Sequence, residues 1–272
     1  QIDFESIYPN FKQRINQFEK GPKNNPYFLY CLGLAHLHKG LIAMRFEKNL
    51  EGALDFRKSY LLLKQNKEHF PQFTPTDFYL GILSSAVGTI PKGYQWVANL
   101  FGMNGKISEG NAMVLNYINS KNDLSQRTRN EALFVYPYLV MFFENNEKKA
   151  FDFIDHQDYD FKTNQMHAYM AANLNLNHQR SSKALSIINQ IDNNDTYLKL
   201  PFWHLESGYA YLNELKLDIA QKELSEFINT NKGFFYIKDA YEKLSWIALL
   251  QNDMKKAQVY RTQVLKKGTI TT

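Results

Sequence analysis

The feature that most constrains the fold is a small residue that recurs at nearly constant spacing in the second half of the chain. Ala150, Ala184, Ala220 and Ala257 each follow a short polar turn and open an amphipathic stretch, and successive positions lie 34, 36 and 37 residues apart. A period of this length is typical of stacked pairs of antiparallel helices, because one pair cannot bury both of its apolar faces alone. The sequence therefore predicts an all-α fold, an α-solenoid of degenerate helix pairs.

The clearest copy of this plan spans residues 201–233. Its first helix is expected to carry apolar side chains on two sides, so neighbouring helices must cover it on two sides. Gly208 lies in the middle of that helix, where glycine is about 1 kcal/mol less favourable than alanine. We expect close approach of the second helix to be the reason for this glycine. Asp218 is expected to cap the second helix.

Three residues of this copy match the pattern of a known helical repeat. Gly208, Tyr211 and Ala220 fall where tetratricopeptide repeats place a glycine, an aromatic residue and the small residue that opens the second helix. Residues 201–267 thus resemble two such repeats, although Ser207 stands where the family has leucine. Residues 124–272 as a whole resemble a series of such repeats. The resemblance implies that the first helices line a concave groove, and it places on that side Tyr169, Asn173, Phe202, Tyr209 and Trp246.

The N-terminal part, residues 1–123, is predicted to be helical but less regular. Leu32 and Gly33, with Ala53 beyond them, are interpreted as a further divergent helix pair. We expect this region to continue directly into the repeats of residues 124–272, so that the two form one elongated unit.

The segment 74–110 differs in composition from the rest. It contains six of the chain's 13 glycines. Thr74 followed by Pro75 predicts a helix start, and Pro91 predicts the end of that helix. The segment resembles a glycine-rich module in a eukaryotic tetratricopeptide family linked to inclusion-body clearance, and also uncharacterised envelope proteins of Bacteroidetes-type bacteria. The second resemblance favours a periplasmic or cell-envelope location, with a cytoplasmic one left open.

The chain carries no motif typical of an enzyme or of a cofactor site. The glycines near Gly102 lack the Lys-Ser/Thr ending of a phosphate loop, and no Gly-x-Ser-x-Gly sequence occurs. A single cysteine, Cys31, excludes a thiolate zinc site. His36 and His38 are two residues apart and so point to different sides of a helix. We therefore expect no catalysis, no cofactor and no metal.

Two functions remain open. In the first, the concave face binds a protein or peptide partner, as a scaffold would. In the alternative, segment 74–110 binds a small molecule or a membrane surface through Trp96, Leu100 and Phe101. Nucleic acid is disfavoured because the basic residues are scattered lysines rather than arginines. The longest apolar run, residues 132–143, is too short to span a bilayer. Partner identity and oligomeric state stay open.

Overall fold

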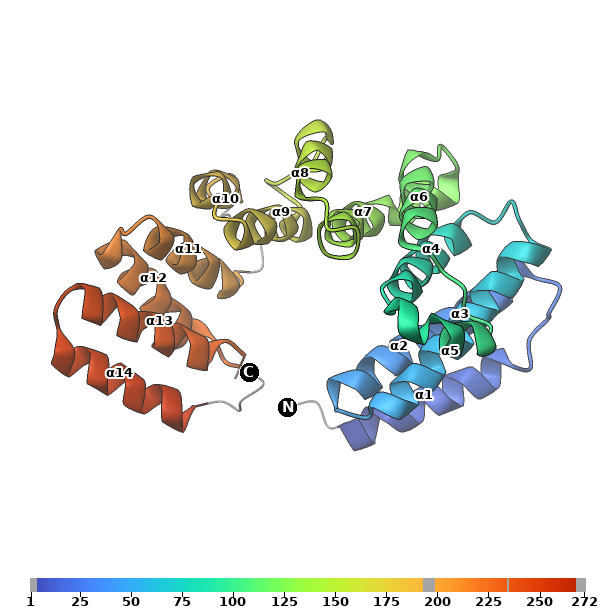
Figure 1. Cartoon of the computed structure of the whole chain (residues 1–272), viewed down its shortest axis with the longest axis horizontal. Coiled ribbons are helices and arrows are strands. Elements are labelled where there is room, and N and C mark those ends of the chain that lie inside the picture. Colours follow the sequence, from blue (N-terminus) through green and yellow to red (C-terminus); the bar gives the residue numbers. More distant parts are fainter. Residues whose placement is uncertain (1–3, 193–198, 234, 268–272) are drawn as a thin grey trace. The chain divides into compact units, whose positions relative to one another are not determined.

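All regular elements that the structure describes are helices (Figure 1). The structure, a computed structural model, describes residues 4–192, 199–233 and 235–267, and no strand occurs in these ranges. The all-α class is thus confirmed. The chain divides into two compact units, residues 1–156 and 157–272. The division expected between residues 123 and 124 falls inside the first unit.

The first unit contains longer helices and the glycine-rich segment. Neighbouring helices pack in the pairs α2 with α3 and α4 with α6. Its elements in chain order are α1 (Phe4–Phe18), α2 (Pro26–Arg45), α3 (Asn49–His69), α4 (Pro75–Gly88), the 3-10 helix η1 (Lys92–Tyr94), α5 (Gln95–Leu100), α6 (Ile107–Asn119), α7 (Asp123–Tyr138), the π-helical turn η2 (Leu139–Phe143) and α8 (Glu147–His156).

The second unit consists of three helix pairs. The two helices of each pair contact each other. Consecutive pairs are joined by contacts of α10 with α11 and of α12 with α13. The elements are α9 (Gln165–Asn177), α10 (Ser181–Ile188), α11 (Phe202–Asn213), α12 (Leu217–Thr230), α13 (Ile237–Leu250) and α14 (Met254–Lys266). Leu205, Leu224, Phe227 and Leu244 are central to the core between α11, α12 and α13.

One type of turn joins the two helices in five pairs. A single residue in the left-handed region ends the first helix, and these residues are Glu47, Asn145, Gln179, Leu215 and Asn252. In four of the turns the amide of the next residue donates to a carbonyl oxygen five residues back, as Lys216 N does to Tyr211 O at 2.9 Å. This is the Schellman closure of a helix. Asn146 N instead reaches six residues back to Val140 O, because it follows the π-helical turn η2.

A small buried residue follows each of these turns at a fixed distance. Five residues after the left-handed position stand Gly52, Ala150, Ala184, Ala220 and Ala257, and all five are buried. The four alanines are therefore the residues by which each second helix approaches its partner. The interpretation of Ala53 as the small residue of α3 was wrong, because Ala53 is exposed and Gly52 faces α2. There, a Cβ on Gly40 would lie 3.1 Å from Gly52 O.

The middle of α11 shows the close approach that the sequence predicted. A Cβ on Gly208 would lie 2.7 Å from Leu224 Cγ on α12. The capping role expected for Asp218 is wrong, since α12 begins at Leu217 and Asp218 lies in its first turn. There its carboxylate accepts a hydrogen bond from Gln251 Nε2 at 2.8 Å, which joins α12 to the end of α13.

The glycines of segment 74–110 allow α4 and α6 to cross at backbone contact. A Cβ on Gly81 would lie 2.8 Å from Gly110 O, and one on Gly88 would lie 2.5 Å from Ile107 N. Gly105 packs in the same way against the backbone of Ser84. Four of the six glycines of the segment thus serve helix packing, which explains its composition without a ligand.

Candidate functional site

The five residues expected in a groove all lie in the second unit, on α9, α11 and α13. Asn173, Tyr209 and Trp246 occupy equivalent places, each six residues before the left-handed residue that ends its own helix. Tyr169 lies one turn earlier on α9, and Phe202 opens α11. Successive first helices touch, since α11 contacts both α9 and α13. We call the surface that these five residues share the first-helix face.

Aromatic rings connect the three helices of this face. The ring centroids of Tyr169 and Phe202 are 6.5 Å apart, and those of Phe202 and Tyr236 are 5.7 Å apart. The hydroxyl of Tyr209 donates a hydrogen bond to the carboxylate of Asp239. Phe202 and Tyr209 also pack against the core of the unit. These rings therefore form both the surface of the face and part of its support.

Trp246 is the most exposed of the five groove residues. Its exposed fraction is 46%. The ammonium of Lys243 lies 3.8 Å from its ring centroid, which is a cation–π geometry. Lys243 Nζ also lies 3.4 Å from Asp239 Oδ1 and 3.5 Å from Glu242 Oε2. The indole therefore lies at the surface in contact with Lys243. The carboxylates of Asp239 and Glu242 hold this lysine in place.

A buried carboxylic acid on α11, Glu206, contacts Asn173 of the same face, and sequence reasoning missed it. Its exposed fraction is 4%. Asn173 Nδ2 donates a hydrogen bond to Glu206 Oε1 at 3.3 Å, whereas Oε2 has no hydrogen-bond partner within the described ranges. Burial raises the pKa of Glu206 to about 7. Burial and the nearby Glu206 carboxylate also raise the pKa of Tyr169 to about 12. The only signal in the sequence was an acid in a helix that was expected to be apolar on two sides.

The alternative site lies in the first unit, at the glycine-rich segment. Trp96 and Leu100 on α5 are exposed, with fractions of 65% and 75%. Phe101 is tied to α3, because Arg57 Nε donates to its carbonyl oxygen at 2.9 Å and the guanidinium lies over its ring. An open cleft of about 750 Å³ lies nearby, lined among others by Gln95, Asn99, Asn104 and Glu144.

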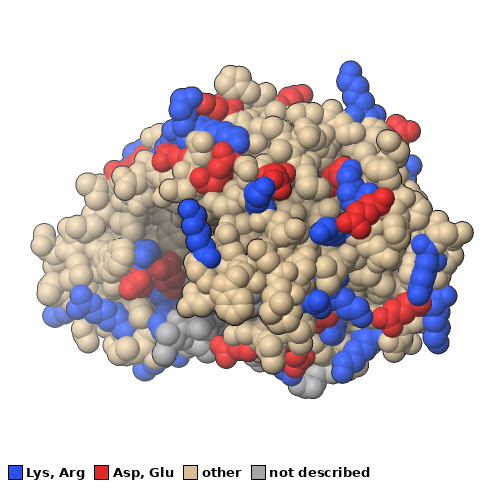
Figure 2. Space-filling model, turned by 45° about the vertical axis from the view of Figure 1, so that its right-hand side comes forward, with Lys and Arg blue, Asp and Glu red and all other residues tan. Residues whose placement is uncertain are grey.

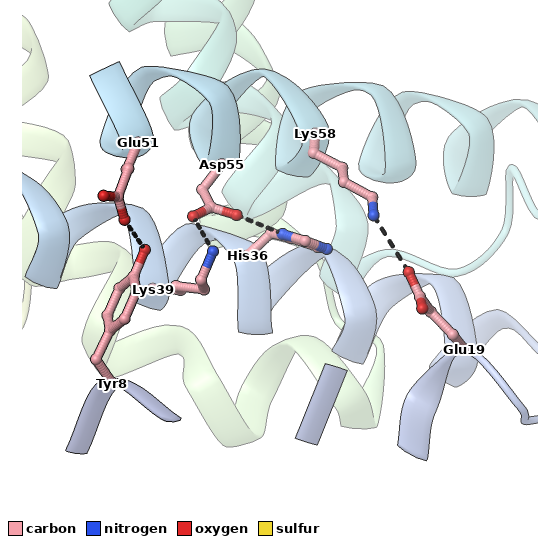
Figure 3. A network of polar contacts seen from close by, with 7 residues as sticks. All are labelled: Tyr8, Glu19, His36, Lys39, Glu51, Asp55 and Lys58. Carbon is pink, nitrogen blue, oxygen red and sulfur yellow. Dashed lines mark hydrogen bonds and ion pairs between the residues drawn. The ribbon is translucent and has the colours of Figure 1, made fainter. Parts of the chain in front are cut away.

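A polar network inside the first unit joins α2 to α3 (Figure 3). His36 Nδ1 lies 2.7 Å from Asp55 Oδ1, and Lys39 Nζ donates to Asp55 Oδ2 at 2.6 Å. Although burial opposes it, the hydrogen bonds from His36 and Lys39 hold the pKa of Asp55 below its usual range. His36 and Asp55 are both buried, so a substrate has no access to them.

The same kind of pair recurs in the second unit. His204 Nδ1 lies 2.7 Å from Glu223 Oε2, and both histidines precede their acid by 19 residues. The two histidines also begin a shared pattern, His-Leu-x-x-Gly, at residues 36–40 and 204–208. Recurrence at one place in two helix pairs supports a packing role for these histidines.

Charge is mixed over the surface. In Figure 2 the Lys and Arg side chains alternate with Asp and Glu side chains and with wide uncharged areas. Within the described ranges no three His, Cys, Asp or Glu side chains are grouped to hold a metal ion. None of the described helices is both long and apolar enough to cross a bilayer.

No family model matches the chain, and a search of curated proteins finds no match. Its function therefore has to be inferred from the residues of the two surfaces.

Proposed function

We propose that this protein is an α-solenoid of degenerate tetratricopeptide-like helix pairs that binds a protein or peptide partner and catalyses no reaction. The recurring left-handed turn, followed five residues later by a small buried residue, supports the repeat assignment. Continuous stacking of such pairs would leave the first helices exposed along one side, where extended ligands bind in helical-repeat proteins.

The observation that carries the binding role is Trp246. A large indole that stands about half exposed on a helix, with Tyr236 and Phe235 also exposed nearby in the chain, is apolar surface that folding leaves uncovered. Tryptophan and tyrosine are the residues that most often dominate binding energy at protein interfaces. The first-helix face therefore has both an exposed anchor and a rigid aromatic support.

Replacing Trp246 by alanine is expected to weaken partner binding strongly without unfolding the protein. Loss of a binding anchor typically costs about 2 kcal/mol or more, which corresponds to about thirtyfold in affinity. The exposed ring adds little to the core, so the melting temperature should stay close to that of the parent. The measurement is affinity for peptides selected from a random library on the immobilised full chain, with melting followed by circular dichroism.

Leu265→Ala is the matched control, because Leu265 is an exposed apolar residue on α14, with a fraction of 89%. It should leave both affinity and melting temperature unchanged. Equal binding by the Trp246 variant and the parent would exclude the first-helix face as the binding site.

A second candidate function is binding at the glycine-rich segment. The open cleft favours a small molecule, and exposed Trp96 and Leu100 favour a membrane surface, where tryptophan side chains are enriched.

If this segment binds a membrane surface, we expect co-flotation of the full chain with vesicles of mixed neutral and anionic lipid. A double change of Trp96 and Leu100 to serine should abolish it, whereas Trp246→Ala should not. Flotation that is unaffected by the double change would remove this candidate.

A further inference from the structure

Glu206 is the least satisfied charged group of the second unit's first-helix face. It is almost fully buried, yet among the described residues only one of its two oxygens has a hydrogen-bond partner, the side-chain amide of Asn173. A buried carboxylate is destabilising unless it is paired and hydrogen-bonded. An acid is not a shared feature of this place, because the equivalent positions on α9 and α13, nine residues before the turn, are Met170 and Lys243.

The groups around Glu206 are aromatic or acidic. Burial is the main reason why the pKa values of the Tyr169 and Tyr209 hydroxyls are raised, and the Glu206 carboxylate adds to the effect in both. Tyr236 and Asp239 face Tyr209 from the α13 side. The lysine of this region, Lys243, is engaged with Asp239, Glu242 and the Trp246 ring. Within the part of the chain that the structure describes, this place thus offers negative charge and aromatic rings, and no lysine or arginine is paired with Glu206.

This combination fits a cationic group from outside. Ammonium and guanidinium groups are bound by carboxylates through charge-assisted hydrogen bonds and by the faces of aromatic rings. Glu206 Oε2 is itself buried, whereas Tyr169 and Tyr209 are only partly buried, so binding of a cation requires side chains of this face to move. Rotamer changes of this kind are common when interfaces form.

We propose that Glu206 is the recognition site for one basic side chain, lysine or arginine, of a peptide that lies across α9, α11 and α13. The proposal rests on the binding role proposed above and names the ligand chemistry. In the bound state the cation pairs with Oε2, while Asn173 keeps its bond to Oε1 and Trp246 contacts a neighbouring part of the peptide.

The test uses four pentapeptides, acetyl-Gly-Tyr-X-Phe-Gly-amide, in which X is lysine, arginine, norleucine or glutamine, titrated onto the full chain by calorimetry at pH 8. We expect the lysine and arginine peptides to bind at least tenfold more tightly than the norleucine peptide, which has a similar chain without the charge. In the Glu206→Gln variant this preference should vanish.

Glu226→Gln is the matched control, because it removes the same formal charge from an exposed acid on α12, and it should keep the preference. Equal binding of all four peptides by the parent would overturn this proposal and leave the peptide-binding function intact. Binding of none of them would count against both. A preference that survives in Glu206→Gln would overturn the role of Glu206 alone.

Discussion

Replacing Gly110 by alanine is expected to destabilise the first unit by about 3 kcal/mol, at the upper end of what overpacking a core does. The added Cβ would meet Ser85 Oγ and Gly81 O, and it would lie 2.6 Å from Ser85 N. Two of these three contacts are backbone atoms of α4, which cannot move aside without separating the helices. The melting transition of the first unit should fall by about 6–12 °C, at about 2–4 °C per kcal/mol for a unit of this size.

Gly93→Ala is the matched control within the same glycine-rich segment. A Cβ there would meet nothing within 4 Å, and the residue is not in the left-handed region. Its melting temperature should equal or slightly exceed that of the parent, because alanine reduces the entropy of the unfolded chain. Gly208→Ala should fall between the two, since the nearest atoms that it meets belong to the movable side chain of Leu224. Equal melting of the Gly110 and Gly93 variants would contradict backbone contact between α4 and α6.

Replacing Glu206 by glutamine is expected to stabilise the second unit at pH 8 and to change little at pH 4.5. The pKa of Glu206 is raised from 4.5 to about 7 in the folded protein, because burial disfavours the charged form. Below the unfolded pKa both states bind the proton, and the native state suffers no penalty. As the pH rises from 4.5 through 7 the unfolded state loses its proton first, so the parent loses stability over this window.

The size of the effect follows from the same shift. A difference of this extent corresponds to about 3 kcal/mol, and we expect a gain of about 1–3 kcal/mol at pH 8, because the new amide N–H also needs a partner. Asn173 on α9 donates a hydrogen bond to Glu206, and the electrostatic neighbours of its carboxylate are Tyr169 on α9 and Tyr209 on α11. Tyr236 and Asp239 in turn act on Tyr209. Urea unfolding at both pH values measures the effect. A variant that is less stable than the parent at pH 8 would show that the carboxylate is paired in solution.

If the Glu206→Gln protein gains stability while it loses its preference for basic peptides, the acid is present for binding and not for folding. Functional sites often retain groups that are unfavourable for folding, and removing such a group stabilises the fold at the expense of activity. The combination would also exclude unfolding as the cause of lost binding, because the variant would be the more stable protein.

Much of the helical organisation could be predicted from local patterns. The spacing of the four alanines located the second helices of four pairs, and each of these alanines is buried where its helix begins. Gly208 was expected at a close helix contact and packs on Leu224. The helix starting at Pro75 and its end before Pro91 were also predicted correctly. These features depend on turn chemistry and small side chains, which act within a few residues of where they stand.

Other features could not be predicted, because they depend on which residue another helix brings into contact. Gly33 was singled out and does lie against Leu63 of α3, but the contact of Gly40 with Gly52 was missed and Ala53 was named instead, since only the crossing of α2 and α3 decides which small residue is enclosed. The pattern His-Leu-x-x-Gly at residues 36–40 and 204–208 was visible in the sequence, but its meaning became clear only from the acids Asp55 and Glu223 that each histidine meets on the following helix.

The sequence by itself determined that this chain forms helices, where most of them turn, and which small residues let them approach, because backbone propensity and periodicity are local. The tertiary structure alone decided that the glycines of segment 74–110 bring α4 and α6 to backbone contact, and that Glu206 is buried beside Asn173 of α9. The physical reason is that burial is a property of neighbours. An acid in a helix is an ordinary solvated side chain until residues 33 positions away on another helix remove it from water.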